Sequence, residues 1–117
     1  MERDARAYLW DVQDSAAAIT EFVGSKTIDD YLADRMLRSA VERQLGIIGE
    51  ALSQLAKHFP ELAQRIPELS RVIGLRNILI HGYTTINHST VWSAVHDHLP
   101  ALRQRASELL SELGASS

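Results

Sequence analysis

The chain has 117 residues, of which 45% are hydrophobic and 23% are charged, as in an ordinary globular domain. It contains no cysteine, which excludes disulfide-stapled folds and thiolate metal sites and is compatible with a reducing cytosol. The formal net charge of −3 excludes attraction of the whole surface to nucleic acid, so RNA binding needs a local patch or one formed by two copies. We expect one cytoplasmic domain spanning residues 1–117, because no apolar stretch has the length of a signal core or a membrane span.

The first predicted helix carries apolar residues at spacings of three and four, which form one amphipathic face: Tyr8, Val12, Ala16, Ile19 and Val23. Gly24 is placed to end this helix, since glycine is favoured just beyond a helix end. Residues 25–28 then form a turn. Either Asp29 or Asp30 caps the next helix, because a carboxylate can accept the unpaired amide hydrogens of a first turn.

The second predicted helix is the longest and ends at Pro60. Its apolar stripe consists of Leu37, Val41, Leu45, Ile48, Leu52, Leu55 and Phe59. Gly46 and Gly49 lie inside it, where each costs about 1 kcal/mol relative to alanine. They are either tolerated defects or points where another helix approaches closely, and their separation of about one turn favours the close approach.

The segment from Pro60 to Pro67 is short, and we expect one helical turn followed by a bend. The third predicted helix starts near Pro67, a suitable first-turn proline, and runs to about His81. Its apolar residues point in almost every direction; they are Leu69, Val72, Ile73, Leu75, Ile78, Leu79 and Ile80. A helix that is apolar all round is typically buried, so we expect this helix to be the central element.

The last predicted helix begins at Asn87, His88 or Ser89 and continues to Leu113, with a kink at Pro100. Residues 114–117 form a frayed tail. The sequence shows no convincing period-two strand. It therefore predicts an all-α fold: an antiparallel up-and-down bundle of about four helices plus a short extra turn.

The polar residues near the end of the third predicted helix are hard to explain by packing alone. Arg76 falls inside the apolar arc, and a buried guanidinium needs a carboxylate, a carbonyl cluster or a ligand anion. Asn77 and His81 are four residues apart and share a face. His81 lies where the helix dipole favours an imidazolium that can exchange a proton near neutral pH. Gly82 permits a sharp exit from the helix, which places Tyr83 on an exposed loop.

No carboxylate occurs between Glu68 and Asp97, so the basic residues of this window have no acidic neighbour in the sequence. An anion such as a phosphate is their natural ligand. Arginine suits phosphate in particular, because its planar fork can bind two oxygens and keeps its proton.

A purely structural interpretation stays open. Arg76 would then pair with Glu42 or Glu50 of the long helix, and His81 would cap the helix end through a backbone carbonyl. The combination of an arginine in an apolar arc, a window without acids, a histidine at a helix end and a Gly-Tyr exit nevertheless favours an anion site.

The spacing Arg76, four residues, His81, one residue, Tyr83, on a small all-helical chain, resembles the motif of the HepT family of toxins in the HEPN superfamily. The resemblance extends to residues 40–51, to the stretch Leu75-Arg76-Asn77 at the start of the motif, and to Val91-Trp92 followed by Leu99-Pro100. It covers essentially the whole chain.

This resemblance implies a HEPN-like helical bundle that forms a homodimer, with two copies of the motif at the interface. Members resemble metal-independent endoribonucleases, in which the RNA 2′-OH attacks the adjacent phosphate and leaves a 2′,3′-cyclic end. His81 would then be the general acid–base, Arg76 would stabilise the phosphorane, and Asn77 would orient the 2′-OH or the phosphate. The expected substrate is tRNA; no metal, other cofactor, DNA or membrane is implied.

The resemblance also implies a partner, an MNT-type nucleotidyltransferase antitoxin that transfers AMP from ATP to Tyr83. An adenylylated phenol beside His81 adds bulk and negative charge where the RNA phosphate must lie. Two further hypotheses stay open. One is a non-catalytic HEPN-type binding module that docks a nucleotidyltransferase, and the other is a structural dimer in which Arg76 simply pairs with Glu50.

Overall fold

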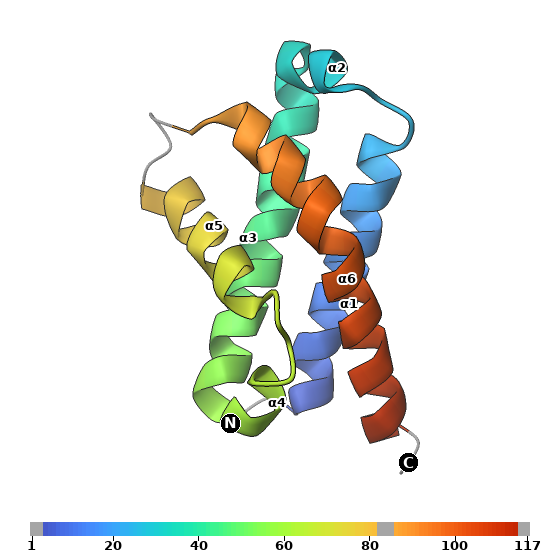
Figure 1. Ribbon diagram of the computed structural model, residues 1–117, viewed down its shortest axis with the longest axis vertical. Coiled ribbons are helices and arrows are strands. Elements are labelled where there is room, and N and C mark those ends of the chain that lie inside the picture. The colour runs from blue at the N-terminus through green and yellow to red at the C-terminus, as the bar shows by residue number, and fades with distance from the viewer. Residues whose placement is uncertain (1–3, 82–85, 115–117) are drawn as a thin grey trace.

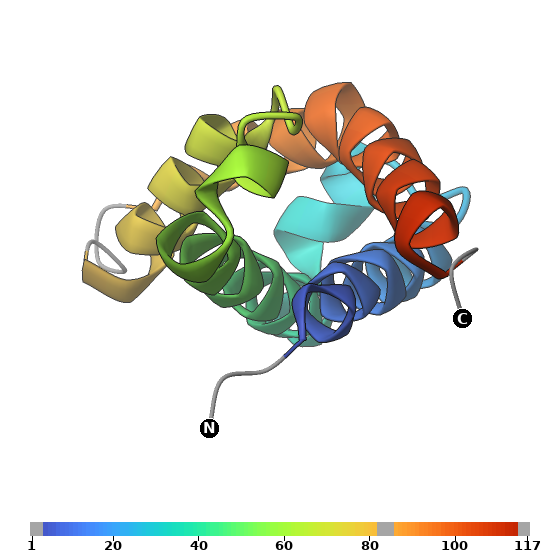
Figure 2. The same cartoon turned by 90° about the horizontal axis from the view of Figure 1, so that it is seen from below.

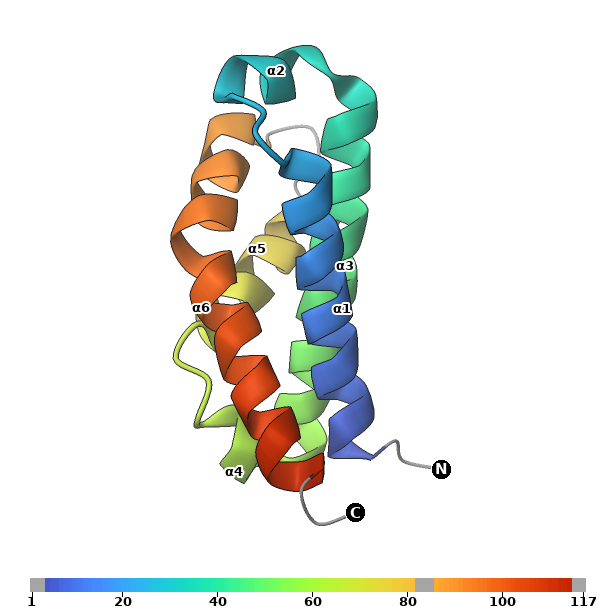
Figure 3. The same cartoon turned by 90° about the vertical axis from the view of Figure 1, so that its right-hand side faces the viewer.

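The computed structural model describes residues 4–81 and 86–114 (Figure 1). In chain order the helices are α1 (Ala5–Val23), α2 (Ile28–Ala33), α3 (Arg35–His58), α4 (Pro60–Ala63), α5 (Leu69–His81) and α6 (His88–Gly114). The long helices α1, α3, α5 and α6 alternate in direction along the molecule (Figures 1 and 3). No strand occurs in the described residues, so the all-α prediction is confirmed for them. The predicted Gly82–Tyr83 exit lies outside them.

The ends of α1 follow directly from the sequence. The carboxylate of Asp4 accepts a hydrogen bond from the backbone N–H of Arg6 at 2.8 Å, which satisfies an amide that has no partner within the helix. At the other end Gly24 has φ of 48°, and its N–H donates to the carbonyl of Thr20 at 2.9 Å. Glycine adopts this left-handed backbone without a steric penalty, so the predicted end of the helix is confirmed.

The connection between α1 and α3 differs from the prediction, because it contains a short helix of its own. Thr27 caps α2: its hydroxyl accepts from the N–H of Asp30 at 3.2 Å, and the Asp30 carboxylate accepts from the N–H of Thr27 at 2.8 Å. These bonds lower the pKa of Asp30. Asp34 caps α3 by accepting from the N–H of Leu37 at 3.1 Å. The expectation that Asp29 or Asp30 caps the long helix is therefore wrong, because both lie in the first turn of α2.

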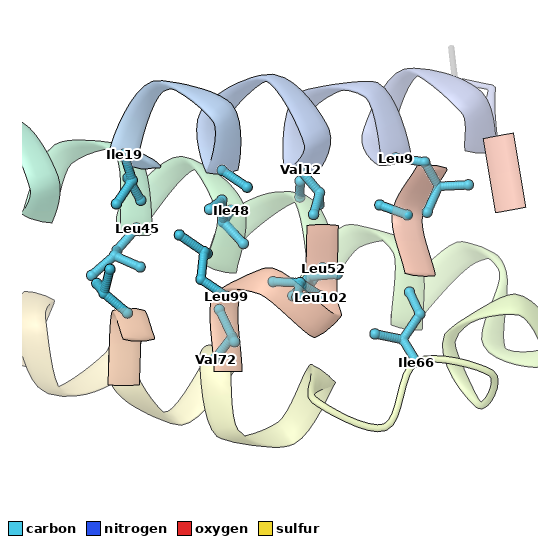
Figure 4. Packing of buried hydrophobic residues seen from close by; sticks show 14 of the residues in the cluster. Leu9, Val12, Ile19, Leu45, Ile48, Leu52, Ile66, Val72, Leu99 and Leu102 are labelled. Carbon is cyan, nitrogen blue, oxygen red and sulfur yellow. The ribbon is translucent and has the colours of Figure 1, made fainter. Parts of the chain in front are cut away.

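The core lies between α1, α3 and α6, whose apolar stripes face one another (Figures 2 and 4). Fully buried residues of the three stripes include Leu9, Val12 and Ile19 from α1, Ile48 and Leu52 from α3, and Leu102 from α6. Burying one such aliphatic side chain stabilises the fold by roughly 1.5–3 kcal/mol. The predicted apolar stripes on the first, second and last helices thus form the core. α3 is packed into this core and also contacts a further helix.

That other helix is α5, which lies at the edge of the molecule against α3 (Figure 2). Among its residues Val72 alone is buried, whereas Ile78 and Ile80 are 53% and 48% exposed. The prediction that this helix is the buried central element is therefore wrong. Apolar residues on every side of a helix show that it avoids water, but they do not show whether its own chain or another molecule covers it.

The remaining boundaries agree with the sequence analysis. α4 is the single turn expected after Pro60. α6 begins at His88, where the side chain of Asn87 accepts from the N–H of Thr90 at 3.1 Å, and the helix is unbroken across Pro100. Within residues 4–81 and 86–114, no helix combines the length and the apolar character needed to cross a membrane.

Candidate active site in the α3–α5 groove

An open groove of about 1140 Å³ runs along α3 between α1 and α5; we call it the α3–α5 groove. Its floor is a row of α3 residues that includes Gly46, Ile47 and Glu50. Arg76, Leu79 and Ile80 of α5 form one wall, and Tyr8 and Asp11 of α1 form the other. Of the predicted site residues, Arg76 lines this groove.

Arg76 reaches the groove across Gly49, which is buried at the point where α5 crosses α3. A Cβ atom on Gly49 would overlap the Cβ and Cγ atoms of Arg76, so only glycine lets the arginine stem lie against α3. A Cβ on Gly46 would meet no atom of the described residues within 4 Å. Close approach is therefore confirmed for Gly49. At Gly46 the described part of the chain gives no such reason.

The guanidinium of Arg76 is held by a short network from both helices. Its Nη2 donates to Oε2 of Glu50 at 2.6 Å, and its Nη1 donates to Oδ1 of Asn77 at 3.2 Å. The other carboxylate oxygen of Glu50, Oε1, accepts from Nε2 of Gln54 at 3.1 Å. Nε of Arg76 is buried and has no hydrogen-bond partner among the described residues. Of the two carboxylates named for the structural interpretation, Glu50 is the one that pairs with Arg76.

His81 is the last residue of α5 and is exposed, as is Asn77 one turn before it. No hydrogen bond joins the His81 ring to another described residue, so the predicted cap to a carbonyl is not found there. The described structure thus brings Arg76 and Asn77 together, while His81 stands at the helix end beside the segment that carries Gly82 and Tyr83. Those two residues lie outside the described ranges.

The absence of acids from the sequence window does not persist in three dimensions. Besides Glu50 on Arg76, Oε2 of Glu42 lies 3.8 Å from Nδ1 of His88. Both carboxylates belong to α3, outside the window, as the structural interpretation allowed for Arg76. Any anion at Arg76 must share the guanidinium with Glu50.

Sequence reasoning gave Gln54 no role and gave Glu50 only a structural one. The signal that could have linked them is their spacing of four on the long helix, which places both on one face of it. Tyr31 was missed as well. It is fully buried near His88 and Glu42, and burial together with the Glu42 charge raises its pKa to about 12.

Comparison with known proteins places this arrangement in a family. Residues 12–109 match the family described as Ribonuclease HepT-like. The chain is 35% identical over 103 residues to MJ1380 of Methanocaldococcus jannaschii, named as a candidate RNase, covering 88% of this chain and 94% of the relative. It is 32% identical over 111 residues to a protein of Thermococcus cleftensis named probable ribonuclease HepT, covering 93% and 98% of the two chains.

A third relative, TTE0752 of Caldanaerobacter subterraneus, also carries the name of a candidate RNase; it is 31% identical over 107 residues, which are 92% of this chain and 95% of the relative. No solved structure gives a significant match. The family match includes the α3 floor and the α5 wall of the α3–α5 groove, with Arg76 and His81. The chain therefore belongs to the HepT-like ribonuclease family of the HEPN superfamily.

Proposed function

We propose that this protein is a metal-independent endoribonuclease, the toxin of a toxin–antitoxin pair, with Arg76, Asn77 and His81 as its catalytic residues. The observation that carries the proposal is the fixed guanidinium of Arg76, held on the wall of an open groove by two partners, with an exposed histidine at the end of the same helix. Membership of a ribonuclease family supports the same reaction class.

The chemistry needs only a fixed cation and a group that moves protons. An imidazole of His81 takes the proton of the RNA 2′-OH, and the 2′-oxygen forms a bond to the adjacent phosphorus. The bond from phosphorus to the 5′-oxygen then breaks, and the leaving oxygen takes a proton from an imidazolium. The products are a 2′,3′-cyclic phosphate and a free 5′-hydroxyl. Arg76 stabilises the negative charge of the phosphorane between these steps.

The hydrogen bond from Arg76 to Asn77 limits what the Asn77 side chain can do for the RNA. Oδ1 of Asn77 accepts from the guanidinium, and the NH₂ group of this exposed side chain donates to no other described residue, so we assign it to a ligand. An NH₂ group donates, so it suits a non-bridging phosphate oxygen or the lone pair of the 2′-oxygen. It does not suit removal of the 2′-OH proton, which leaves that step to His81.

A homodimer would complete the site by bringing two sets of these residues together. Ile78 and Ile80 support this part of the proposal, because two large aliphatic side chains about half exposed on the motif helix are suited to contact between copies. Two facing copies would also place two Arg76 guanidinium groups and two His81 rings near one RNA strand. This arrangement would compensate for the net charge of −3 per chain.

Neutralisation is proposed at Tyr83, by an MNT-type nucleotidyltransferase antitoxin. The phenol oxygen attacks the α-phosphorus of ATP, the bond to the β-phosphate bridging oxygen breaks, and pyrophosphate leaves. Tyr83 follows His81 by two residues, so the transferred AMP would put a phosphate and a nucleoside beside the catalytic ring. The added bulk and charge would then exclude the RNA phosphate.

The decisive experiment is cleavage of total tRNA by purified protein in EDTA, comparing the wild type with His81→Ala. Intact mass of the same samples shows whether Tyr83 carries AMP. We expect cleavage with 2′,3′-cyclic ends by the unmodified wild type, a loss of about 10²–10⁴-fold in His81→Ala, and little change in the control His96→Ala, an exposed histidine on α6. Intact RNA with unmodified wild type, or equal cleavage by His81→Ala, contradicts the proposal.

One observation favours a second candidate function. The only charged partner of Arg76 among the described residues is Glu50, so the guanidinium is already neutralised without RNA. A non-catalytic module that docks a nucleotidyltransferase would keep such a pair. It predicts a stable complex with that enzyme, unchanged by His81→Ala, and no RNA cleavage by either version.

A further inference from the structure

We propose that Glu50 is a positioning residue of the active site: it fixes the Arg76 guanidinium in the orientation that receives the RNA phosphate. The inference rests on the proposed ribonuclease function and adds a residue outside the Arg76–His81–Tyr83 motif. It gives the ion pair between α3 and α5 a catalytic purpose in place of a purely structural one.

The first step of the argument is that Arg76 is constrained along its whole length. Its Cβ and Cγ atoms lie on Gly49, its Nε is enclosed, and its two terminal nitrogens reach Glu50 and Asn77. Of these contacts, the one to Glu50 is the shortest, at 2.6 Å, and the only one to a charged group. Glu50 therefore sets the rotation of the guanidinium plane about the end of the side chain.

The second step is that Glu50 is itself oriented. Gln54, one turn later on α3, donates to Oε1 at 3.1 Å, so the carboxylate is held between an amide on its own helix and the guanidinium on α5. Gln54 thus orients Glu50, and Glu50 orients Arg76. Such orientation matters because a displacement of a catalytic group by about 1 Å can lower the rate roughly 100-fold.

A comparison within the molecule separates this pair from an ordinary surface ion pair. Arg65 and Glu112 also form a short pair, at 2.7 Å, with side chains 48% and 52% exposed. Glu50 is equally exposed, at 51%, but Arg76 is only 24% exposed. Arg76 is thus the more enclosed of the two guanidinium groups, so its carboxylate partner restricts its orientation more than Glu112 restricts that of Arg65.

The third step concerns what is left for a ligand. A guanidinium carries five N–H groups, and Glu50 and Asn77 take one from each terminal nitrogen. Counting partners within the described ranges, one N–H on each terminal nitrogen is left, enough in number for two oxygens of a phosphate. In this proposal Glu50 stays in place while the phosphate binds.

The test compares Glu50→Ala, Glu50→Gln and the matched control Glu112→Ala by steady-state kinetics of RNA cleavage and by thermal unfolding. We expect Glu50→Ala to lower kcat about 10- to 100-fold and to change KM less than about threefold, because the misplaced cation fails mainly in the transition state. Glu50→Gln keeps an acceptor for Nη2 and should recover most of kcat. Glu112→Ala should leave both constants unchanged.

Two results would overturn the inference. A higher kcat/KM in Glu50→Ala means that Glu50 only competes with the phosphate. An unchanged kcat with a lower melting temperature means that the pair is only structural. If Glu50→Ala does not fold, Glu50→Asp takes its place in the test. The aspartate side chain is one methylene shorter, so its carboxylate lies farther from Arg76, and we expect the same fall in kcat.

A readout that needs no catalysis separates this inference from the proposed function. NMR of the Arg76 side chain should show hindered rotation of the guanidinium in the wild type and in Glu50→Gln, and free rotation in Glu50→Ala. Equal rotation in the wild type and in Glu50→Ala refutes positioning, whatever the cleavage assay gives. Hindered rotation that depends on Glu50 in a protein without cleavage would instead refute the ribonuclease function alone.

Discussion

α1 and α5 are both rich in apolar residues, yet the protein uses them differently. α1 buries eight of its 19 residues against α3 and α6, whereas α5 buries Val72 alone among 13. The buried core thus comes mainly from α1, α3 and α6, while the helix with the proposed catalytic motif packs on α3 and keeps Ile78 and Ile80 about half exposed among the described residues. The difference shows that a high content of apolar residues does not by itself separate a core helix from one whose apolar side chains are exposed at the edge.

Of the changes that test this comparison of α1 and α5, Arg76→Ala should have the largest effect; it tests whether α5 contributes more to catalysis than to folding. Losing one group that stabilises the transition-state charge typically costs about 10²–10³-fold in kcat. Losing the partly exposed ion pair should cost about 1 kcal/mol of stability or less. Arg65→Ala breaks the comparable pair with Glu112 and is the control for activity. If Arg76→Ala lowers the melting temperature strongly but leaves RNA cleavage intact, Arg76 and α5 contribute to folding and not to catalysis.

Leu52→Ala and Ile80→Ala contrast the two regions directly. Leu52 is fully buried on α3, so the cavity should lower the free energy of unfolding by about 2–5 kcal/mol in chemical denaturation. Ile80 is 48% exposed, and its truncation should cost about 0.5 kcal/mol or less within one chain. Its effect should appear instead as a weaker dimer in analytical ultracentrifugation. Equal destabilisation by both variants would mean that α5 belongs to the core.

Gly49→Ala and Gly46→Ala sharpen the contact between the regions. Both changes replace glycine inside α3, so the gain in helix propensity cancels in their difference. Only a Cβ on Gly49 meets the Arg76 stem. We expect Gly49→Ala to be less stable than Gly46→Ala by about 1–3 kcal/mol in denaturant unfolding, and to lose cleavage activity. Equal stabilities would show that α5 can move off α3 without cost.

The smallest effect on stability at neutral pH is expected from Tyr31→Phe, which removes a hydroxyl group from the buried core. Its buried hydroxyl has no hydrogen-bond partner among the described residues, so Tyr31→Phe should leave stability at pH 7 unchanged or slightly higher. Burial raises the pKa of Tyr31 to about 12, above its ordinary value near 10. The wild type should therefore lose stability between about pH 10 and 12, because the unfolded chain releases the phenol proton first. Urea unfolding of Tyr31→Phe should lack this part of the loss; an identical alkaline profile in the two proteins would contradict it.

Particular residues show how far the sequence reaches. The period of three to four residues was enough to predict α1, α3 and α6, and Gly24 was enough to predict where α1 ends. The start of α6 was predicted only to within Asn87, His88 or Ser89, and it lies at His88. The short helix α2, which begins after Thr27, was missed. Thr27, Asp29, Asp30 and Asp34 are all residue types that cap helices, and the sequence alone does not show that Thr27 and Asp34 are the two that do so. Arg76, Asn77 and His81 could be singled out from their spacing; their catalytic roles stay predictions.

The sequence by itself determined the helical fold and the residues that offer chemistry, because both depend on local spacing along a helix. Only the tertiary structure decided that α5 lies at the edge, that Gly49 carries the stem of Arg76, and that Glu50 holds its guanidinium. Glu50 and Arg76 are 26 residues apart, and no local period relates them. Their contact depends on how two helices cross, which is set by packing over the whole core.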